Sequence, residues 1–204
     1  MKSKKIIGLT GSIATGKSTA ANIIRLLGYQ VIDADKVAHE LMDKGEANYN
    51  AILETFGNQI LDKNGLIDRN ILGEIVFSDR NKLDLLNSLT HSNIFRKINS
   101  IIEKSENEVI FIELPILFEL KLQDKLSLDI DETWLVYVDY EKQLERLMTR
   151  NDLSFEQAEN RINSQMDVEL KRKHADVVLF NDLDINHLRK QIKKRLDIKD
   201  ESSD

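Results

Sequence analysis

The sequence contains no cysteine and only one proline among its 204 residues. The absence of cysteine excludes disulfide bonds, thiolate catalysis and metal sites built on cysteine. No apolar run approaches the ~20 residues that a membrane-spanning helix needs, so we expect no membrane partner. The chain also lacks an excess of positive charge, because its formal net charge is −6, and we expect no nucleic-acid partner. Together these features predict a cytoplasmic protein.

Five short apolar segments predict the strands of one sheet. They are residues 5–9, 30–33, 108–113, 133–138 and 176–180. Segments with helical spacing lie between them, and buried strands that alternate with helices are typical of a parallel sheet covered on both faces. The sequence therefore predicts an α/β fold with a five-stranded parallel sheet.

Helices are predicted over four regions. The apolar spacing predicts one helix at residues 15–27, a long helical region from about 35 to 104, and two helices at 141–150 and 155–165. Gly57 and Gly65 should interrupt the long region. Ser154 followed by Gln157 has the form of a capping box for the last of these helices.

Residues 8–19 read GLTGSIATGKST and carry the strongest motif. The inner part fits G-x-x-x-x-G-K-[ST] and stands between a predicted strand and a predicted helix, as a phosphate-binding loop requires. Backbone N–H groups and the helix N-terminus then surround the phosphates of a bound nucleotide, but the motif does not decide whether that nucleotide serves a switch, a motor or a kinase. Lys17 would neutralise the β- and γ-phosphates, and the Ser18 hydroxyl would bind Mg²⁺. The predicted nucleotide-binding residues are Gly11, Ser12, Ile13, Ala14, Thr15, Gly16, Lys17, Ser18 and Thr19.

Two carboxylates, Asp33 and Asp35, close the second predicted strand. Residues two apart on a strand point the same way, so both side chains should face the crevice at the carboxyl ends of the strands. A kinase needs a group there that orients the attacking hydroxyl or accepts its proton. The alternative is that an aspartate caps the following helix, and Asp35 also suits that role.

Charged residues near the other strand ends are further candidates. Glu113 ends the third predicted strand and could hold Mg²⁺ through a water molecule. Arg146 and Arg150 lie four positions apart and share one helix face. Such a face is often only solvated, but beside a phosphate loop an arginine-bearing hairpin could close over the nucleotide and stabilise the transferring phosphoryl group.

Three other patterns are weaker. His91 is a lone histidine in a helical region, which is more often structural than catalytic. Residues 62–65 fit D-x-x-G and residues 81–84 fit N-K-x-D, two motifs of guanine-nucleotide switches. In those proteins each motif follows a buried strand, and no convincing strand precedes either segment here. We therefore interpret both as accidental.

Taken in order, these residues resemble the dephospho-CoA kinase family over about residues 5–190. The matching segments are 6–19, 31–35, 38, 56–57, 60–61, 65–69, 76–77, 91, 94, 114–119, 143–150, 161–162, 165 and 175–181. Ser12 and Ala14 depart from the family pattern, because glycines are usual there and each added Cβ strains a position that favours positive φ. Ser92 replaces the usual proline after His91, and Glu113 stands where aspartate is common.

The resemblance implies a single P-loop kinase domain over residues 1–204. Its parts would be a core (1–35, 106–140 and 171–198), a helical substrate lobe (36–105) and a helical lid (141–170). The implied reaction is transfer of the γ-phosphoryl group of ATP, with Mg²⁺, to the ribose 3′-hydroxyl of dephospho-CoA. We also expect the enzyme to be a monomer. The alternatives are another P-loop nucleoside or nucleotide kinase and, in a different class, a nucleotide-binding switch.

The resemblance also implies roles for individual residues. Asp35 would be the base or hydroxyl orienter with Asp33 as its partner, and Arg150 with Arg146 would be the lid cations. Asn181, after the last strand, would contact adenine. The residues carried over as substrate-binding are Asp33, Asp35, His91, Glu113, Leu114 and Pro115.

Overall fold

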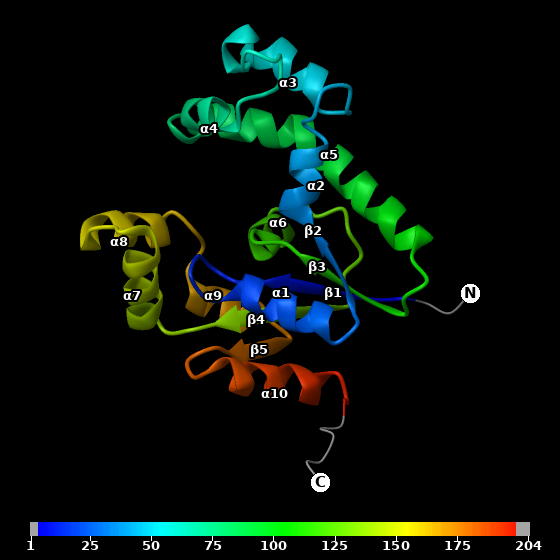
Figure 1. Ribbon diagram of the computed structural model, residues 1–204, viewed down its shortest axis with the longest axis vertical. Helices are drawn as coiled ribbons and strands as arrows, with labels where there is room; N and C mark the ends of the chain where they lie inside the picture. The colour runs from blue at the N-terminus through cyan, green and yellow to red at the C-terminus, as the bar shows by residue number, and fades with distance from the viewer. Residues whose placement is uncertain (1–3, 199–204) are drawn as a thin grey trace. The chain divides into compact units, whose positions relative to one another are not determined.

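The computed structural model describes residues 4–198 and divides into two compact units. The first combines the described residues of Met1–Ile32 and Asn107–Asp204, and the second is Asp33–Glu106. Figure 1 shows the central sheet of the first unit, whose strand order is β2-β3-β1-β4-β5. The strands are β1 (Lys5–Thr10), β2 (Gln30–Asp33), β3 (Val109–Glu113), β4 (Glu132–Tyr137) and β5 (Val177–Phe180). The predicted five-stranded parallel sheet is confirmed, and no strand boundary moves by more than one residue.

Helices cover both faces of this sheet because side chains alternate along its strands. On one face, Ile7 and Leu9 of β1 pack against α1 (Lys17–Leu26) and α10 (Ile185–Arg195). Gly8, between them, faces the other side, where a Cβ would lie 2.3 Å from Leu117 Cδ1 of α6 (Leu117–Leu122). Val168 of α9 (Val168–His174) packs on that side against β4. Burial of these apolar side chains is the main stabilising contribution to the unit.

Two helices follow β4 and form a hairpin, α7 (Tyr140–Asn151) and α8 (Phe155–Asn163). Asp139 caps α7 by accepting a hydrogen bond from Lys142 N at 2.8 Å. The predicted capping box of Ser154 and Gln157 is confirmed at the start of α8. Both predicted helices of this region are therefore present.

The start of β5 is fastened to β4 by a carboxylate. Asp176 Oδ2 accepts hydrogen bonds from Thr133 Oγ1 at 2.6 Å and from Thr133 N at 2.8 Å. These bonds stabilise the charged carboxylate and hold the pKa of Asp176 below its ordinary value. They link two neighbouring strands at their amino ends.

The second unit is helical, as predicted. It contains α2 (Ala34–Glu40), α3 (Tyr49–Phe56), the 3-10 turn η1 (Asn58–Ile60), α4 (Arg69–Phe77) and α5 (Arg80–Lys104). Its core is built on Ile52, Ile60, Leu72 and Val76. Gly57 and Gly65 interrupt the helices with φ values of 78° and 73°, which glycine adopts without steric cost.

The two switch-like motifs lie in this helical unit. Asp62 accepts hydrogen bonds from the backbone N–H groups of Leu66 and Asn64, and the Leu66 bond contributes most to a pKa of Asp62 below its ordinary value. Asn81 is in the first turn of α5, after the N-cap Asp79. Neither segment follows a strand of the sheet, so their interpretation as accidental is consistent with the fold. Among residues 4–198, no helix is long and apolar enough to span a membrane.

Candidate active site

The phosphate loop connects β1 to α1, and its two glycines stand where a side chain would not fit. Gly16 is the N-cap of α1 with a φ of 93°, and a Cβ there would lie 2.1 Å from Asn181 Nδ2. At Gly11 a Cβ would lie 2.6 Å from Thr15 Oγ1, a hydroxyl that donates to Ser12 O at 2.9 Å. The tight loop therefore leaves the N-terminus of α1 as an anion-binding site.

Ser12 and Ala14, which stand where the family usually has glycine, differ in backbone conformation. Ala14 has a φ of 61°, in the left-handed region that is costly for a residue with a Cβ. The expected strain at Ala14 is thus confirmed. The same expectation is wrong for Ser12, whose φ is not positive. Its backbone conformation suits any residue, and its hydroxyl is buried without a hydrogen-bond partner among the described residues.

Three side-chain amides from distant parts of the first unit hold the loop. Gln143 Nε2 of α7 donates to Ile13 O at 2.8 Å, and Ile13 N donates to Gln165 Oε1 at 2.8 Å. Asn181 Nδ2, just after β5, donates to Thr15 O at 2.9 Å. The sequence analysis gives Gln143 and Gln165 no role beyond their place in the segments that resemble the family. For Gln143 the available signal is an uncharged amide on a helix, α7, that is otherwise rich in charge, whereas Gln165 lies after α8 and carries no such signal.

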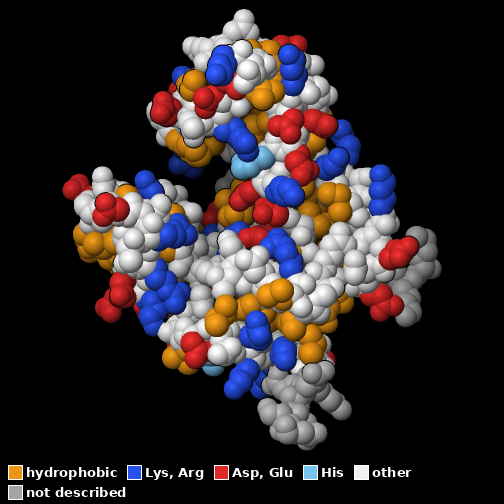
Figure 2. Space-filling model, viewed as in Figure 1, with side chains coloured by type: hydrophobic (Ala, Val, Ile, Leu, Met, Phe, Trp, Pro, Cys, Tyr) orange, Lys and Arg blue, Asp and Glu red, His pale blue; other side chains and the backbone are white. Residues whose placement is uncertain are grey.

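A cavity of about 720 Å³ opens beside the loop. Arg146 lines it and donates from Nη2 to Asn181 O at 2.9 Å, whereas Arg150 is exposed and bonds Asn151 Oδ1 at 2.9 Å. Figure 2 shows basic side chains gathered where α7 lies. The lining residues are Ala14, Gly16, Thr19, Lys142, Glu145, Arg146, Thr149, Arg150, Asn181, Leu183 and Ile185. Six of them were predicted as site residues: Ala14, Gly16, Thr19, Arg146, Arg150 and Asn181.

Leu183 and Ile185 are two lining residues that the sequence did not reveal. Both are exposed apolar side chains that follow β5. Aromatic bases bind against apolar surface in mostly preformed pockets. The cavity therefore offers cations from α7 and an apolar surface for a base.

Glu113 ends β3, is buried, and faces two cations. Its Oε1 lies 2.7 Å from Lys17 Nζ and its Oε2 lies 3.3 Å from Arg25 Nη2. Arg25 was not among the predicted site residues. The next two predicted residues bond to β1: Leu114 N donates to Leu9 O at 3.0 Å, and Pro115 O accepts from Thr10 Oγ1 at 3.1 Å.

The side chains near Lys17 also indicate where a magnesium ion fits. Mg²⁺ takes oxygen ligands and usually keeps several waters. Ser18 is exposed in the first turn of α1, where its hydroxyl suits a hydrated cation. Each Glu113 oxygen already faces a cation, so Ser18 is the better candidate for a direct metal contact.

The remaining predicted residues belong to the second unit. Asp33 is the N-cap of α2 and accepts from Lys36 N at 3.1 Å, whereas Asp35 is in the first turn of that helix. The expectation that both carboxylates point the same way on a strand is therefore wrong, because β2 ends at Asp33. The capping alternative holds for Asp33 and not for Asp35. His91 lies in α5 with its ring centroid 5.8 Å from that of Phe95.

Comparisons with known proteins give a consistent assignment. The family model for dephospho-CoA kinase matches residues 5–187. A dephospho-CoA kinase of Carboxydothermus hydrogenoformans is 45% identical over 190 residues, which cover 92% of this chain and 90% of that protein. The crystal structure of TT1252 from Thermus thermophilus covers 96% of this chain and 98% of its own, with 33% identity and a TM-score of 0.80.

A second solved structure, the dephospho-CoA kinase from Campylobacter jejuni, covers 95% of this chain and 96% of its own. Its sequence identity is 34% and its TM-score is 0.68. The similarity thus spans the sheet, the phosphate loop, the hairpin after β4 and the helical unit alike. The predicted P-loop kinase fold is confirmed, and the chain belongs to the dephospho-CoA kinase family.

Proposed function

We propose that the protein transfers the γ-phosphoryl group of ATP to the ribose 3′-hydroxyl of dephospho-CoA, giving CoA and ADP in the last step of CoA biosynthesis. The observation that carries the proposal is the cavity where the phosphate loop, the α7 arginines and Asn181 meet, in a chain of this family. We also propose a monomeric, cytoplasmic enzyme.

The ATP side of the reaction uses the first unit. The phosphates bind at residues 11–19, where the N-terminus of α1 favours negative charge, and Lys17 neutralises the β- and γ-oxygens. Ser18 is the proposed Mg²⁺ ligand, and the bound ion adds charge neutralisation at the phosphates. Arg146 is anchored on Asn181, so the exposed Arg150 is the cation that stabilises the transferring group.

The acceptor side uses the helical unit and the segment after β3. Residues 36–105 form the proposed substrate lobe and 141–170 the proposed lid. Asp35 orients the 3′-hydroxyl or accepts its proton, and Asp33 supports it by capping the helix that carries it. His91, Glu113, Leu114 and Pro115 are the other proposed substrate-binding residues, with Glu113 reaching Mg²⁺ only through water.

The test of this function is acceptor-dependent ADP release. Dephospho-CoA is compared with a panel of nucleosides, nucleoside monophosphates and a sample without acceptor, each with ATP and with GTP. We expect ATP turnover that depends on dephospho-CoA. Activity confined to the panel would instead identify a nucleoside or nucleotide kinase. GTP preference without acceptor stimulation would identify a switch.

The proposed role of Asp35 has its own test. We expect Asp35→Asn to lower kcat by about 10²-fold or more, as losses of a general base do, and to leave ATP binding unchanged. Asp33→Asn is the matched comparison, since asparagine caps a helix as well as aspartate does, and its loss should be smaller. Near-wild-type turnover of Asp35→Asn would remove Asp35 from the mechanism.

A further inference from the structure

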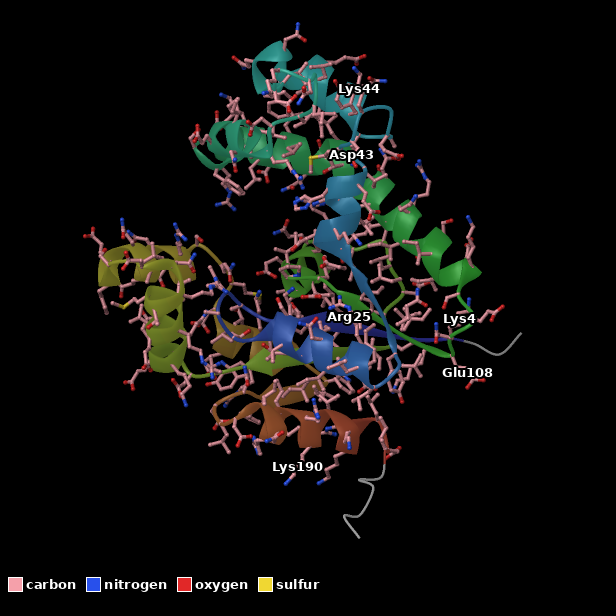
Figure 3. All side chains as sticks on the ribbon, in the orientation of Figure 1. Lys4, Arg25, Asp43, Lys44, Glu108 and Lys190 are labelled. Atoms are coloured by element: carbon pink, nitrogen blue, oxygen red, sulfur yellow. The ribbon has the colours of Figure 1, made fainter. Side chains whose placement is uncertain are left out.

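Arg25 lies on α1, eight positions after Lys17; it is labelled in Figure 3. Its Nη2 approaches Glu113 Oε2 at 3.3 Å, and its Nη1 donates to Asn22 Oδ1 at 3.0 Å. Asn22 is one turn earlier on the same helix, so it steers the guanidinium. Arg25 is thus fixed between a neutral acceptor on its own helix and the carboxylate that also holds Lys17.

The environment of Glu113 makes its partners important. The Glu113 side chain is only 6% exposed, whereas the Arg25 side chain is 38% exposed. A buried charge is tolerated when it is paired and becomes costly when a partner is removed. Glu113 therefore needs a cation at all times, while Arg25 reaches water whether or not it is paired.

ATP binding changes the pairing of Glu113. In the proposed function Lys17 turns to the β- and γ-phosphates, so its ammonium is no longer devoted to Glu113. Without a second cation, each contact that Lys17 makes with a phosphate would weaken its ion pair with Glu113 and leave the buried carboxylate unpaired. Arg25 does not need to move, because its bond goes to the other carboxylate oxygen.

We propose that Arg25 is a positioning residue for phosphoryl transfer. Arg25 keeps Glu113 paired and in place while the Lys17 ammonium turns to the phosphates. It thereby lowers the free energy needed to separate Lys17 from Glu113. This inference rests on the ATP-binding part of the proposed function and is independent of the acceptor.

The test is ATP affinity, measured by calorimetry with Mg²⁺ and without acceptor. We expect Arg25→Gln to weaken ATP binding about tenfold, a factor below that of a fully buried pair because Arg25 is partly solvated. Arg25→Lys should recover most of the affinity. In steady-state assays, Arg25→Gln should raise the KM for ATP more than it lowers kcat.

A double-mutant cycle separates this role from bulk charge and from helix packing. In a Glu113→Gln background, Arg25→Gln should change ATP affinity by less than about twofold, since a neutral amide needs no cation. Arg189→Gln is the matched control, because it removes the same charge from an exposed position on α10. It should leave the affinity unchanged, and thermal unfolding without ATP verifies that each variant is folded.

Two results would overturn the inference: wild-type affinity in Arg25→Gln, or an equal loss in both Glu113 backgrounds. If Arg25→Gln does not fold, the ATP affinity of Arg25→Lys decides the question. An affinity close to that of the wild type supports the inference, and an affinity about tenfold weaker contradicts it. A wild-type protein that binds ATP but does not phosphorylate dephospho-CoA would refute the acceptor assignment alone. Failure of the wild type to bind ATP would refute both proposals.

Discussion

Replacing Ala14 by glycine should stabilise the protein, which is unusual for a change from alanine to glycine. Ala14 has a φ of 61°, and this left-handed conformation costs an L-residue with a Cβ roughly 1–2 kcal/mol. Glycine removes that cost but adds about 0.4–1 kcal/mol of conformational entropy to the unfolded chain. The net effect is a stabilisation of about 1 kcal/mol, or a Tm rise of about 2–4 °C for a chain of this size.

Ala158 provides the opposite case in the same unit. It lies inside α8 and is fully buried. Ala158→Gly removes the same methyl group from ordinary helical backbone, where glycine costs about 1 kcal/mol, and the lost burial adds to that cost. The two substitutions should therefore shift Tm in opposite directions.

Trp134 is the only tryptophan and is buried in the first unit, so its fluorescence reports the unfolding of that unit. The assay compares urea and thermal unfolding of the wild type, Ala14→Gly and Ala158→Gly without nucleotide. A Tm for Ala14→Gly at or below that of the wild type would refute the strain argument. Because the loop keeps its conformation, ATP affinity of Ala14→Gly should not fall.

Two further predictions concern contacts described above. Gln165→Ala removes the acceptor of the Ile13 N–H, so it should cost about 1 kcal/mol of stability and raise the KM for ATP. Gln165→Glu keeps an acceptor and should restore the stability, but its negative charge beside the phosphate loop should leave the KM for ATP raised. A Glu variant as unstable as the Ala variant would contradict this. The pKa of Asp176 is lower in the folded than in the unfolded chain because Thr133 donates to it, so its contribution is present above the unfolded pKa and disappears as pH falls through the folded pKa. Urea midpoints of the wild type and Asp176→Asn should therefore differ at pH 7 and converge below pH ~4; a constant gap would argue against the carboxylate.

The strands could be predicted because their signal is local. A buried parallel strand is a short apolar run bounded by turn residues, and β1 to β5 are all of this kind. The helix α9 was not predicted, and its composition explains why. One of its inward residues is Lys171, only 1% exposed, which pairs with Glu119 at 2.8 Å and donates to Pro115 O. A buried lysine gives no apolar periodicity.

Other misses have different causes. In α10 the spacing of Ile185, Leu188 and Ile192 has helical periodicity, so that helix is predictable from the sequence although it is not among the predicted helices. At residues 33–35 the apolar strand pattern was extended too far. Asp33 bonds Lys36 N and starts a helix, and a capping aspartate looks the same in sequence as an aspartate on a strand.

For the phosphate loop too, local sequence patterns predict some features and not others. Its glycine spacing follows from backbone geometry and predicts the loop correctly, whereas the expected left-handed conformation is present at Ala14 and absent at Ser12. The amides that hold it come from residues as far as 152 and 166 positions away. Such contacts depend on how β4, β5 and the hairpin pack, and no local pattern encodes them.

The ion-pair network behind the loop is better explained by catalysis than by folding. Buried ion pairs contribute little net stability, because desolvation offsets their attraction. In the proposed function Lys17 binds the phosphates and therefore needs a partner before ATP arrives, and Glu113 lies 2.7 Å from it. A partner that held Lys17 too firmly would compete with the phosphates. In the proposed role of Arg25, the second cation on the same carboxylate weakens the Lys17–Glu113 ion pair. Lys17 is then positioned before ATP binds and can still turn to the phosphates.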